Sequence, residues 1–241
     1  MVKGEVTAPT APIPKEVQKV RKAPAKAPKA VSNKELKPVK LPEMKLFGRW
    51  STAGIQVKDA GIKDYINLDP RLVPKVYSRF MAKRQFYKSK SSIVERLINH
   101  LFVVGHKGKK HKLTSGRNVG KTGHAISAVI KGFEIIEGQT KMNPVEVLVR
   151  AIENSAPLEE VISYQRGGIF VREAVVTAPQ RRVDLALRHI TQGTYKKSFA
   201  SKKTAAQALA DEIIAAYKKD SAGSYAVSEK NRREREATES R

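Results

Sequence analysis

The spacing of apolar residues restricts most of this chain to α-helix. In SSIVERLINHLFVV (91–104) they recur every three or four positions behind Ser92, a residue suited to cap a helix, so one side of that helix would be apolar. Four later segments repeat the spacing, and three of them begin near a capping residue or a proline. They are HAISAVIKGFEIIE (124–137), VEVLVRAIENS (145–155) after Asn143 and Pro144, QRRVDLALRHITQ (180–192) after Pro179, and SKKTAAQALADEIIAAYKK (201–219) from Ser201. The pattern predicts a mainly α fold, a single helical domain of about five to six helices.

One segment has a different period. In VISYQRGGIFVREAVV (161–176) apolar and polar residues alternate on both sides of Arg166, Gly167 and Gly168, which is typical of two strands joined by a glycine turn. We expect a β-hairpin at about 161–176 that protrudes from the helical domain. Arg166 at its tip and Arg172 on one arm would make it a narrow cationic ribbon, able to enter a nucleic-acid groove. An ordinary surface hairpin is the alternative.

Composition divides the chain into four parts. Residues 1–45 hold 7 of the 12 prolines and many lysines. Because proline interrupts helices and sheets while lysines repel one another, we expect an extended basic N-terminal tail there. Residues 46–90 form a basic junction segment, with a short helix near Ile62–Asn67. The helical core spans 91–227. The end at 228–241 is helical in propensity but has almost nothing to bury, so we expect a charged C-terminal tail ordered mainly by contact.

Net charge restricts the partners of the chain. It has 47 Lys and Arg against 23 Asp and Glu, a formal charge of +24, and so positive a surface repels itself unless a polyanion neutralises it. Nucleic acid is the expected partner. A membrane is not expected, because the chain has no long apolar run and no basic amphipathic helix with bulky aromatic residues. It has no cysteine, which excludes disulfides and thiolate metal sites, and we expect a soluble intracellular protein.

SGRNVGKT (115–122) resembles a nucleotide-binding P-loop, with Gly120, Lys121 and Thr122 in its last three positions. Ser115 replaces the expected first glycine, and the preceding GHKGKKHKLT is too polar for the buried strand that a P-loop follows. We therefore expect no bound nucleotide. The glycine amides, the basic side chains and the following helix start still favour an anion, which RNA phosphates would supply.

Patterns for catalysis and metal binding are missing. The five histidines show no HExxH pairing, and we interpret them as loop and surface residues. Serine, histidine and aspartate do not occur as a nucleophile elbow, and Glu159–Glu160 resembles a polar lead-in to the hairpin more than a carboxylate pair. We predict that the protein is not an enzyme and has no metal and no cofactor.

Clustered basic residues are the candidate RNA contacts, since in so positive a chain they are better interpreted as phosphate ligands than as solvated faces. Tyr195, which lies among them, could stack on a base or pack beneath its own loop. The candidates are Arg79, Lys83, Arg84, Lys107, Lys109, Lys110, Arg117, Lys121, Arg181, Arg182, Lys196, Lys197, Lys202, Lys203, Arg232, Arg233 and Arg241.

Several stretches together resemble the universal small-subunit ribosomal protein seven family, called protein five in eukaryotic ribosomes. No single motif carries the resemblance, but the order and spacing of the motifs are specific. The stretches are LFGRWS (46–51), IVERLIN (93–99), GRNVGK (116–121), GFEII (132–136), NPVEVLVRAIENSAP (143–157), RGGIFVREAVVTAPQRRVDLAL (166–187), ALADEIIAA (208–216) and SYAV (224–227).

The resemblance implies a structural constituent of the small ribosomal subunit that binds the 3′ major domain of its ribosomal RNA in the head and supports head assembly and translation. Neighbouring head proteins would be further partners. Arg166–Gly168 and Arg172 would face the mRNA exit path and exit-site tRNA, while Arg117, Asn118 and Lys121, with Arg181 and Arg182, would touch ribosomal RNA. It also implies a cytoplasmic ribosomal location, with assembly in the nucleolus.

Some features depart from that family. GHKGKKHKLTS (105–115) resembles an insertion, the hairpin tip reads QRGG where the family more often has G-R-A-G, and the tail at 1–45 has no counterpart in the conserved domain. KAPAKAPKA within that tail is similar to linker-histone tails, so a chromatin or DNA-binding protein is the alternative. A long hairpin between the third and fourth helices fits that alternative poorly.

Overall fold

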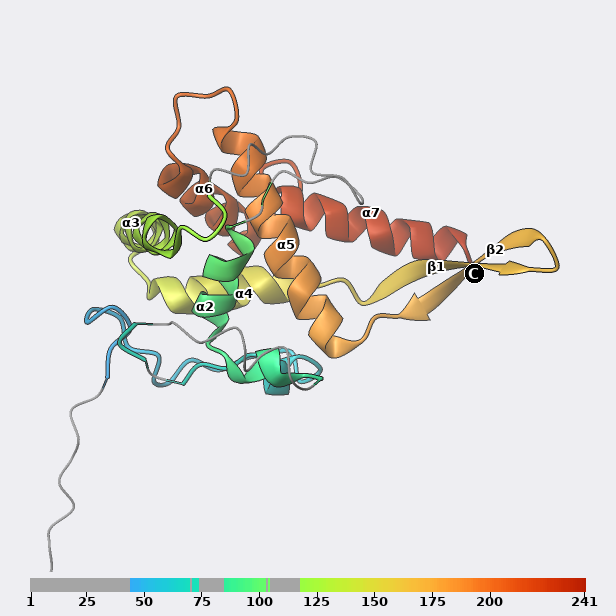
Figure 1. The fold of residues 1–241 in the computed structure, drawn as a ribbon, viewed down its shortest axis with the longest axis horizontal. Helices are drawn as coiled ribbons and strands as arrows, with labels where there is room; N and C mark the ends of the chain where they lie inside the picture. The colour runs from blue at the N-terminus through green and yellow to red at the C-terminus, as the bar shows by residue number, and fades with distance from the viewer. Residues whose placement is uncertain (1–43, 70, 74–84, 103, 105–117) are drawn as a thin grey trace, which may run out of the picture. The chain divides into compact units, whose positions relative to one another are not determined.

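Six α-helices and one two-stranded hairpin make up the regular structure that a computed structural model describes for residues 44–69, 71–73, 85–102, 104 and 118–241 (Figure 1). This confirms the mainly α prediction with a single hairpin, whereas the predicted tail at 1–45 lies almost wholly outside the described residues. The elements are η2 (Lys63–Tyr65), η3 (Tyr87–Lys90), α2 (Ile93–His100), α3 (Thr122–Thr140), α4 (Pro144–Ser155), β1 (Glu159–Arg166), β2 (Ile169–Val176), α5 (Pro179–Ser198), α6 (Ala205–Tyr217) and α7 (Tyr225–Glu239).

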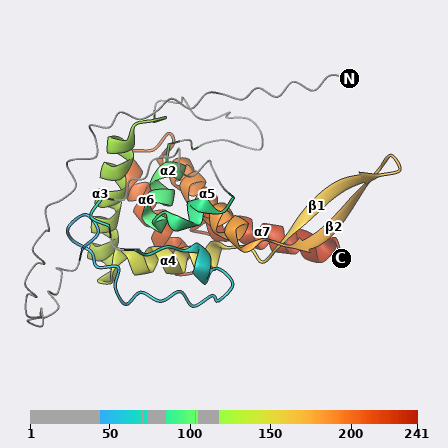
Figure 2. The same ribbon diagram turned by 60° about the horizontal axis from the view of Figure 1, so that its bottom comes forward.

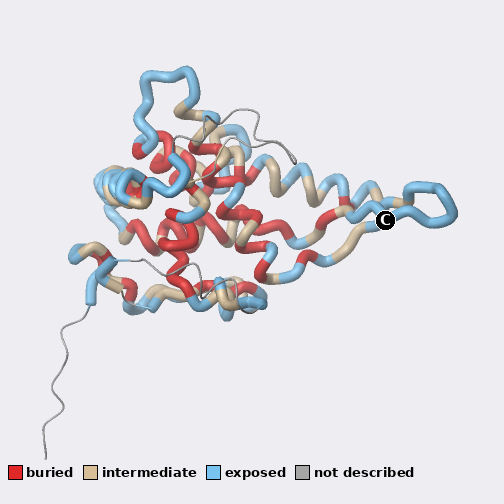
Figure 3. The backbone as a smooth tube through the Cα atoms, in the orientation of Figure 1, coloured by how far each residue is buried: buried red, intermediate tan, exposed pale blue. Residues whose placement is uncertain are grey.

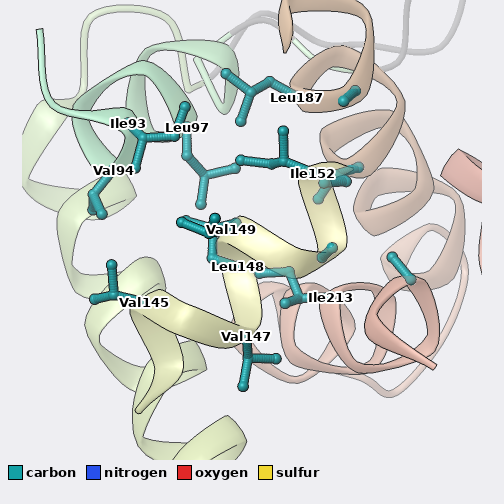
Figure 4. Packing of buried hydrophobic residues seen from close by; sticks show 14 of the residues in the cluster. Ile93, Val94, Leu97, Val145, Val147, Leu148, Val149, Ile152, Leu187 and Ile213 are labelled. Carbon is teal, nitrogen blue, oxygen red and sulfur yellow. The ribbon is translucent and has the colours of Figure 1, made fainter. Parts of the chain in front are cut away.

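Helix α4 is the centre of the core. It packs against α3, α5, α6 and α7, and Val145, Leu148 and Ile152 are all fully buried (Figure 4). Asn143 caps the helix as expected, because its side chain accepts a hydrogen bond of 3.0 Å from the Val145 amide, and Pro144 occupies the first turn. Most sides of α4 are buried in keeping with this central position, and its one partly exposed side carries Glu146, Arg150, Glu153 and Asn154.

The junction segment is joined to this core by its tryptophan. The Trp50 ring packs edge-on against Phe133 of α3 at 5.6 Å, and its indole N–H donates to Glu137 at 2.9 Å. Ile62 is fully buried at the start of η2, a short 3₁₀ turn where the sequence predicts a short helix. The segment predicted mainly as a basic lead-in therefore contributes part of the hydrophobic core.

Helix α7 covers most of residues 228–241, where the sequence indicates a charged tail of helical propensity ordered mainly by contact. Ser224 caps this helix, and Ala237 near its far end is fully buried. The carboxylate of Glu234 accepts a hydrogen bond of 3.0 Å from the Leu158 amide, just before β1. Helix α7 lies beside the base of the hairpin in both ribbon views (Figures 1 and 2). A few small apolar residues are enough to dock a highly charged helix here.

Two predicted caps also need correction. Helix α6 begins after Thr204, not Ser201, and Thr204 and Gln207 exchange the two hydrogen bonds of a capping box. Ser201 instead donates to the Lys197 carbonyl at 2.8 Å. Ser92 occupies the N-cap position of α2, but its hydroxyl makes no capping hydrogen bond within the described part of the chain.

The hairpin runs from Glu159 to Val176 in regular antiparallel register, with Arg166 opposite Ile169. Its turn consists of Gly167 and Gly168, with φ of 57° and 86°, both in the left-handed region that a two-residue hairpin turn requires. Beyond its base the hairpin is largely exposed (Figure 3). The sequence analysis began the hairpin at about residue 161, because it interpreted Glu159 and Glu160 as a polar lead-in. In the structure these two residues already pair with Val176 and Val175 of β2.

Candidate nucleic-acid interface

Seven of the predicted RNA contacts lie outside the described residues, and so does most of the basic glycine-rich loop. They are Arg79, Lys83, Arg84, Lys107, Lys109, Lys110 and Arg117. For these residues the prediction stands on sequence alone.

The described end of the glycine loop forms the approach to α3. Gly120 has a φ of 74° and directs the chain into the helix, whose first turn contains no acidic residue. Lys121 occupies the exposed N-cap position, and the Asn118 side chain donates to the Leu101 carbonyl at 3.4 Å. Free backbone N–H groups and a lysine at a helix start attract an anion. Among the described residues the only sheet is the two-stranded hairpin, so the parallel strand of a P-loop has no counterpart there.

Arg181 and Arg182 are neighbours in the first turn of α5 but have opposite environments. Arg182 is buried; its guanidinium donates to the Pro157 carbonyl at 3.1 Å and to Asp59 at 2.7 Å. The donors of Arg182 are therefore directed into the protein, and its contact with RNA stays a prediction. The Arg181 side chain is 52% exposed and forms a bidentate ion pair with Glu160 at 2.5 and 2.7 Å. The hydrogen bonds to Glu160 raise the pKa of Arg181. Arg181 remains accessible to a phosphate.

Carboxylates at the base of the hairpin engage two further candidates. Arg233 of α7 lies 3.6 Å from Glu160, and Arg241 pairs with Glu159. Arg232 pairs along its own helix with Glu229 at 2.7 Å and Glu236 at 2.5 Å. Arg233 and Arg241 join the C-terminal segment to the hairpin base, as Arg181 joins α5 to it. Since exposed pairs are worth only about 0–1 kcal/mol, Arg232 and Arg241 could exchange these partners for phosphate at little cost.

The end of α5 and the following loop contain four predicted contacts with three different environments. Lys197 lies 2.7 Å from the buried carboxylate of Glu212, and Lys203 lies 2.6 Å from Asp211. The Lys196 ammonium lies over the Tyr225 ring, 3.5 Å from its centroid. Lys202 is exposed, and no carboxylate of the described segments pairs with it. The lysines available to an external anion are therefore Lys196 and Lys202.

The hairpin presents its two arginines on opposite faces. By register, Arg166 shares a face with Tyr164 and Val171, whereas Arg172 shares the other face with Phe170. Both arginines are exposed, and so is the apolar tip, where Ile169 is 71% and Phe170 75% exposed. The sequence indicates a cationic ribbon, and the exposed apolar tip was not predicted from it. The distance of the tip from the helices is what leaves both faces open.

The structure corrects the prediction of surface positions for two histidines. His189 is buried in α5 against Tyr225, and burial lowers its pKa to about 4, assisted by Arg233 and opposed by Glu229. His100 is half-buried, and its pKa is lowered to about 4 for the same main reason. Within the described ranges no group of three or more acidic, histidine or cysteine side chains could hold a metal ion, and none of the helices seen there is long and apolar enough to span a membrane.

These histidines predict acid sensitivity. Their pKa in the folded protein lies below the ordinary value of 6.5, so the unfolded chain binds the proton first. Their contribution to the free energy of unfolding is complete above pH 6.5 and is lost as the pH falls towards 4. We expect urea unfolding between pH 7 and 5 to show a slope of up to about 1.4 kcal/mol per pH unit per histidine. His189→Leu should remove roughly half of that slope, and an unchanged slope would contradict the assignment.

Comparison with known proteins adds a finding independent of this geometry. A family model described as ribosomal protein S7p/S5e matches residues 70–241. The chain is 46% identical over 199 residues to small ribosomal subunit protein uS7 of Nanoarchaeum equitans (strain Kin4-M). The aligned residues cover 83% of this chain and 100% of that protein. It is 44% identical over 197 residues to uS7 of Methanococcoides burtonii (82% and 99% covered) and 47% identical over 193 residues to uS7 of Methanosphaera stadtmanae (80% and 96% covered).

Proposed function

The chain belongs to the ribosomal protein S7p/S5e family, and from that premise we propose that it is a structural constituent of the small ribosomal subunit that binds ribosomal RNA. It is not an enzyme, in keeping with that family. The observation that carries the proposal is the similarity to small ribosomal subunit proteins along 100% of one relative's length and 83% of this chain.

Binding would rest on electrostatics held in a fixed geometry. Accessible cations lie at helix starts and in a loop between helices: Lys121 at the N-cap of α3, Arg181 in the first turn of α5 and Lys202 in the α5–α6 loop. Each lysine or arginine that neutralises a phosphate releases a condensed counterion, so affinity should fall steeply with salt. The internal ion pairs contribute differently, since Arg182 with Asp59 and Lys197 with Glu212 fix the elements that carry the accessible cations. Shape-based recognition of folded RNA requires this kind of rigid support.

We further propose that the RNA bound is the 3′ major domain in the head, with neighbouring head proteins as additional partners. The hairpin would reach towards the mRNA exit path and exit-site tRNA. What supports this is its exposure beyond Glu160 and the placement of Arg166 and Arg172 on opposite faces, which would let it touch two partners at once. The protein would work in cytoplasmic ribosomes, with assembly in the nucleolus.

Co-sedimentation tests the proposal. We expect the full chain to migrate with small ribosomal subunits through a sucrose gradient at moderate salt and to be released as salt is raised. A protein that stays at the top of the gradient and binds duplex DNA tightly would instead support the chromatin alternative. Nucleotide crosslinking should give no signal with the natural chain or with Lys121→Ala, because the preceding sequence GHKGKKHKLT is too polar for the buried strand that a P-loop follows.

A further inference from the structure

An exposed aromatic ring is held at the end of α5. Phe199 is 58% exposed, although its backbone N–H is tied to the Tyr195 carbonyl at 2.8 Å. Its ring stacks on the Tyr195 ring, with centroids 5.6 Å apart and planes 29° apart. Ala200 follows with a φ of 53°, a left-handed conformation that non-glycine residues adopt only at a cost of about 1–2 kcal/mol. The pair is thus a two-ring stack at the start of the exposed α5–α6 loop (Figures 1 and 3).

The charges beside this stack are positive. Lys196 and Lys202 flank it in the chain, both are exposed, and neither has a carboxylate partner within the described segments. The nearby acidic residues are already engaged, since Glu212 pairs with Lys197 and Asp211 with Lys203. Apolar surface beside exposed cations that have no described carboxylate partner suits a ligand that combines a flat ring with negative charge.

We propose that Phe199 and Tyr195 form a stacking platform for an unpaired nucleobase of RNA, with Lys196 and Lys202 beside the adjoining phosphates. This inference deepens the proposed function and rests on it. Every base has a π-face, so such a platform binds a single-stranded or bulged nucleotide with little sequence preference. A base inside an A-form duplex is stacked on its neighbours, so only an unpaired or splayed base can occupy the platform. An apolar side chain of a neighbouring protein could cover the ring too, but it would leave Lys196 and Lys202 without an anionic partner.

A binding assay with the full chain and a small-subunit ribosomal RNA transcript tests the platform. We expect Phe199→Leu to weaken RNA affinity roughly 5- to 150-fold, the loss of one base stacked on an aromatic ring. Phe199→Tyr keeps the ring and should remain within about twofold. The dependence of log affinity on log salt should not change in Phe199→Leu but should become shallower by about one in Lys202→Ala, because only the lysine neutralises a phosphate. Since the ring is exposed, thermal melting should show all three variants folded.

A second readout locates the contact. Ultraviolet crosslinking followed by mass spectrometry should place a nucleotide adduct on the peptide that contains Tyr195 and Phe199. Natural-level affinity of Phe199→Leu and no adduct would overturn the platform while leaving the proposed function intact. An unchanged affinity for the transcript, combined with poorer incorporation into subunits, would also overturn it and assign the ring to a protein neighbour. Failure of the natural chain to bind the transcript at all would refute the proposed function itself.

Discussion

Glu212→Ala is expected to lower the free energy of unfolding by about 3–5 kcal/mol, because it removes a fully buried carboxylate from the junction of three helices. One oxygen of that carboxylate accepts from the Ser224 hydroxyl at 2.9 Å and from the Ala226 amide at 3.0 Å, which fixes the start of α7 on α6. The other oxygen lies 2.7 Å from the Lys197 ammonium of α5. Without the carboxylate, two buried donors and the lysine lose their partner.

Urea denaturation monitored by the fluorescence of Trp50, the single tryptophan, measures this loss. Gly193→Ala tests the same junction from the opposite side, since a Cβ at residue 193 would lie 2.5 Å from the Glu212 carboxyl carbon. Overpacking of this kind costs about 1–3 kcal/mol. Gly138→Ala in α3 is the matched control: its Cβ would meet nothing within 4 Å, so it should stabilise the helix by up to about 1 kcal/mol. If Gly193→Ala behaves like the control, the position of Glu212 is not fixed as described.

Sequence patterns predict the parts of this fold that depend on local chemistry. Asn143 with Pro144 places the start of α4, and Gly167 with Gly168 places the hairpin turn, because each residue type has few alternative conformations. The docking of helix α7 depends on residues distant in sequence: Ala237 is buried, and Glu234 accepts a hydrogen bond from the Leu158 amide. The spacing of apolar residues does not predict where such a helix docks, because small residues and ion pairs hold it in place.

In the candidate interface, too, the sequence predicts the general chemistry but not the partners that are distant in sequence. Net charge predicts a polyanionic partner, but it cannot distinguish a cation that faces solvent from one that is paired internally. Lys202 and Lys203 are adjacent in sequence, yet only Lys203 has a described carboxylate partner, supplied by Asp211 of α6. Tyr195 was open to two interpretations, and its ring stacks on Phe199, four residues later at the end of α5.

Arg182→Met is expected to lower the free energy of unfolding by about 3 kcal/mol and to leave the salt dependence of RNA binding unchanged. The guanidinium of Arg182 joins three separate parts of the protein: α5 itself, the Pro157 carbonyl before the hairpin, and Asp59 of the junction segment. Methionine retains the aliphatic bulk but removes every donor, so a buried carbonyl and an acidic side chain lose their partner. Urea denaturation gives the first quantity, and RNA affinity measured across a salt series gives the second.

Arg181→Met is the matched control, because it is the same substitution one position away in the same helical turn. Its ion pair with Glu160 is more than half exposed on the arginine side, so the loss in unfolding free energy should stay near 0–1 kcal/mol. Its accessible guanidinium should instead matter for RNA: the slope of log affinity against log salt should become shallower by about one. Since helix propensity and formal charge change equally in both variants, only the directions of the two side chains can separate them. Equal stability losses, or a salt slope altered by Arg182→Met, would contradict the division between an internal and an RNA-facing arginine.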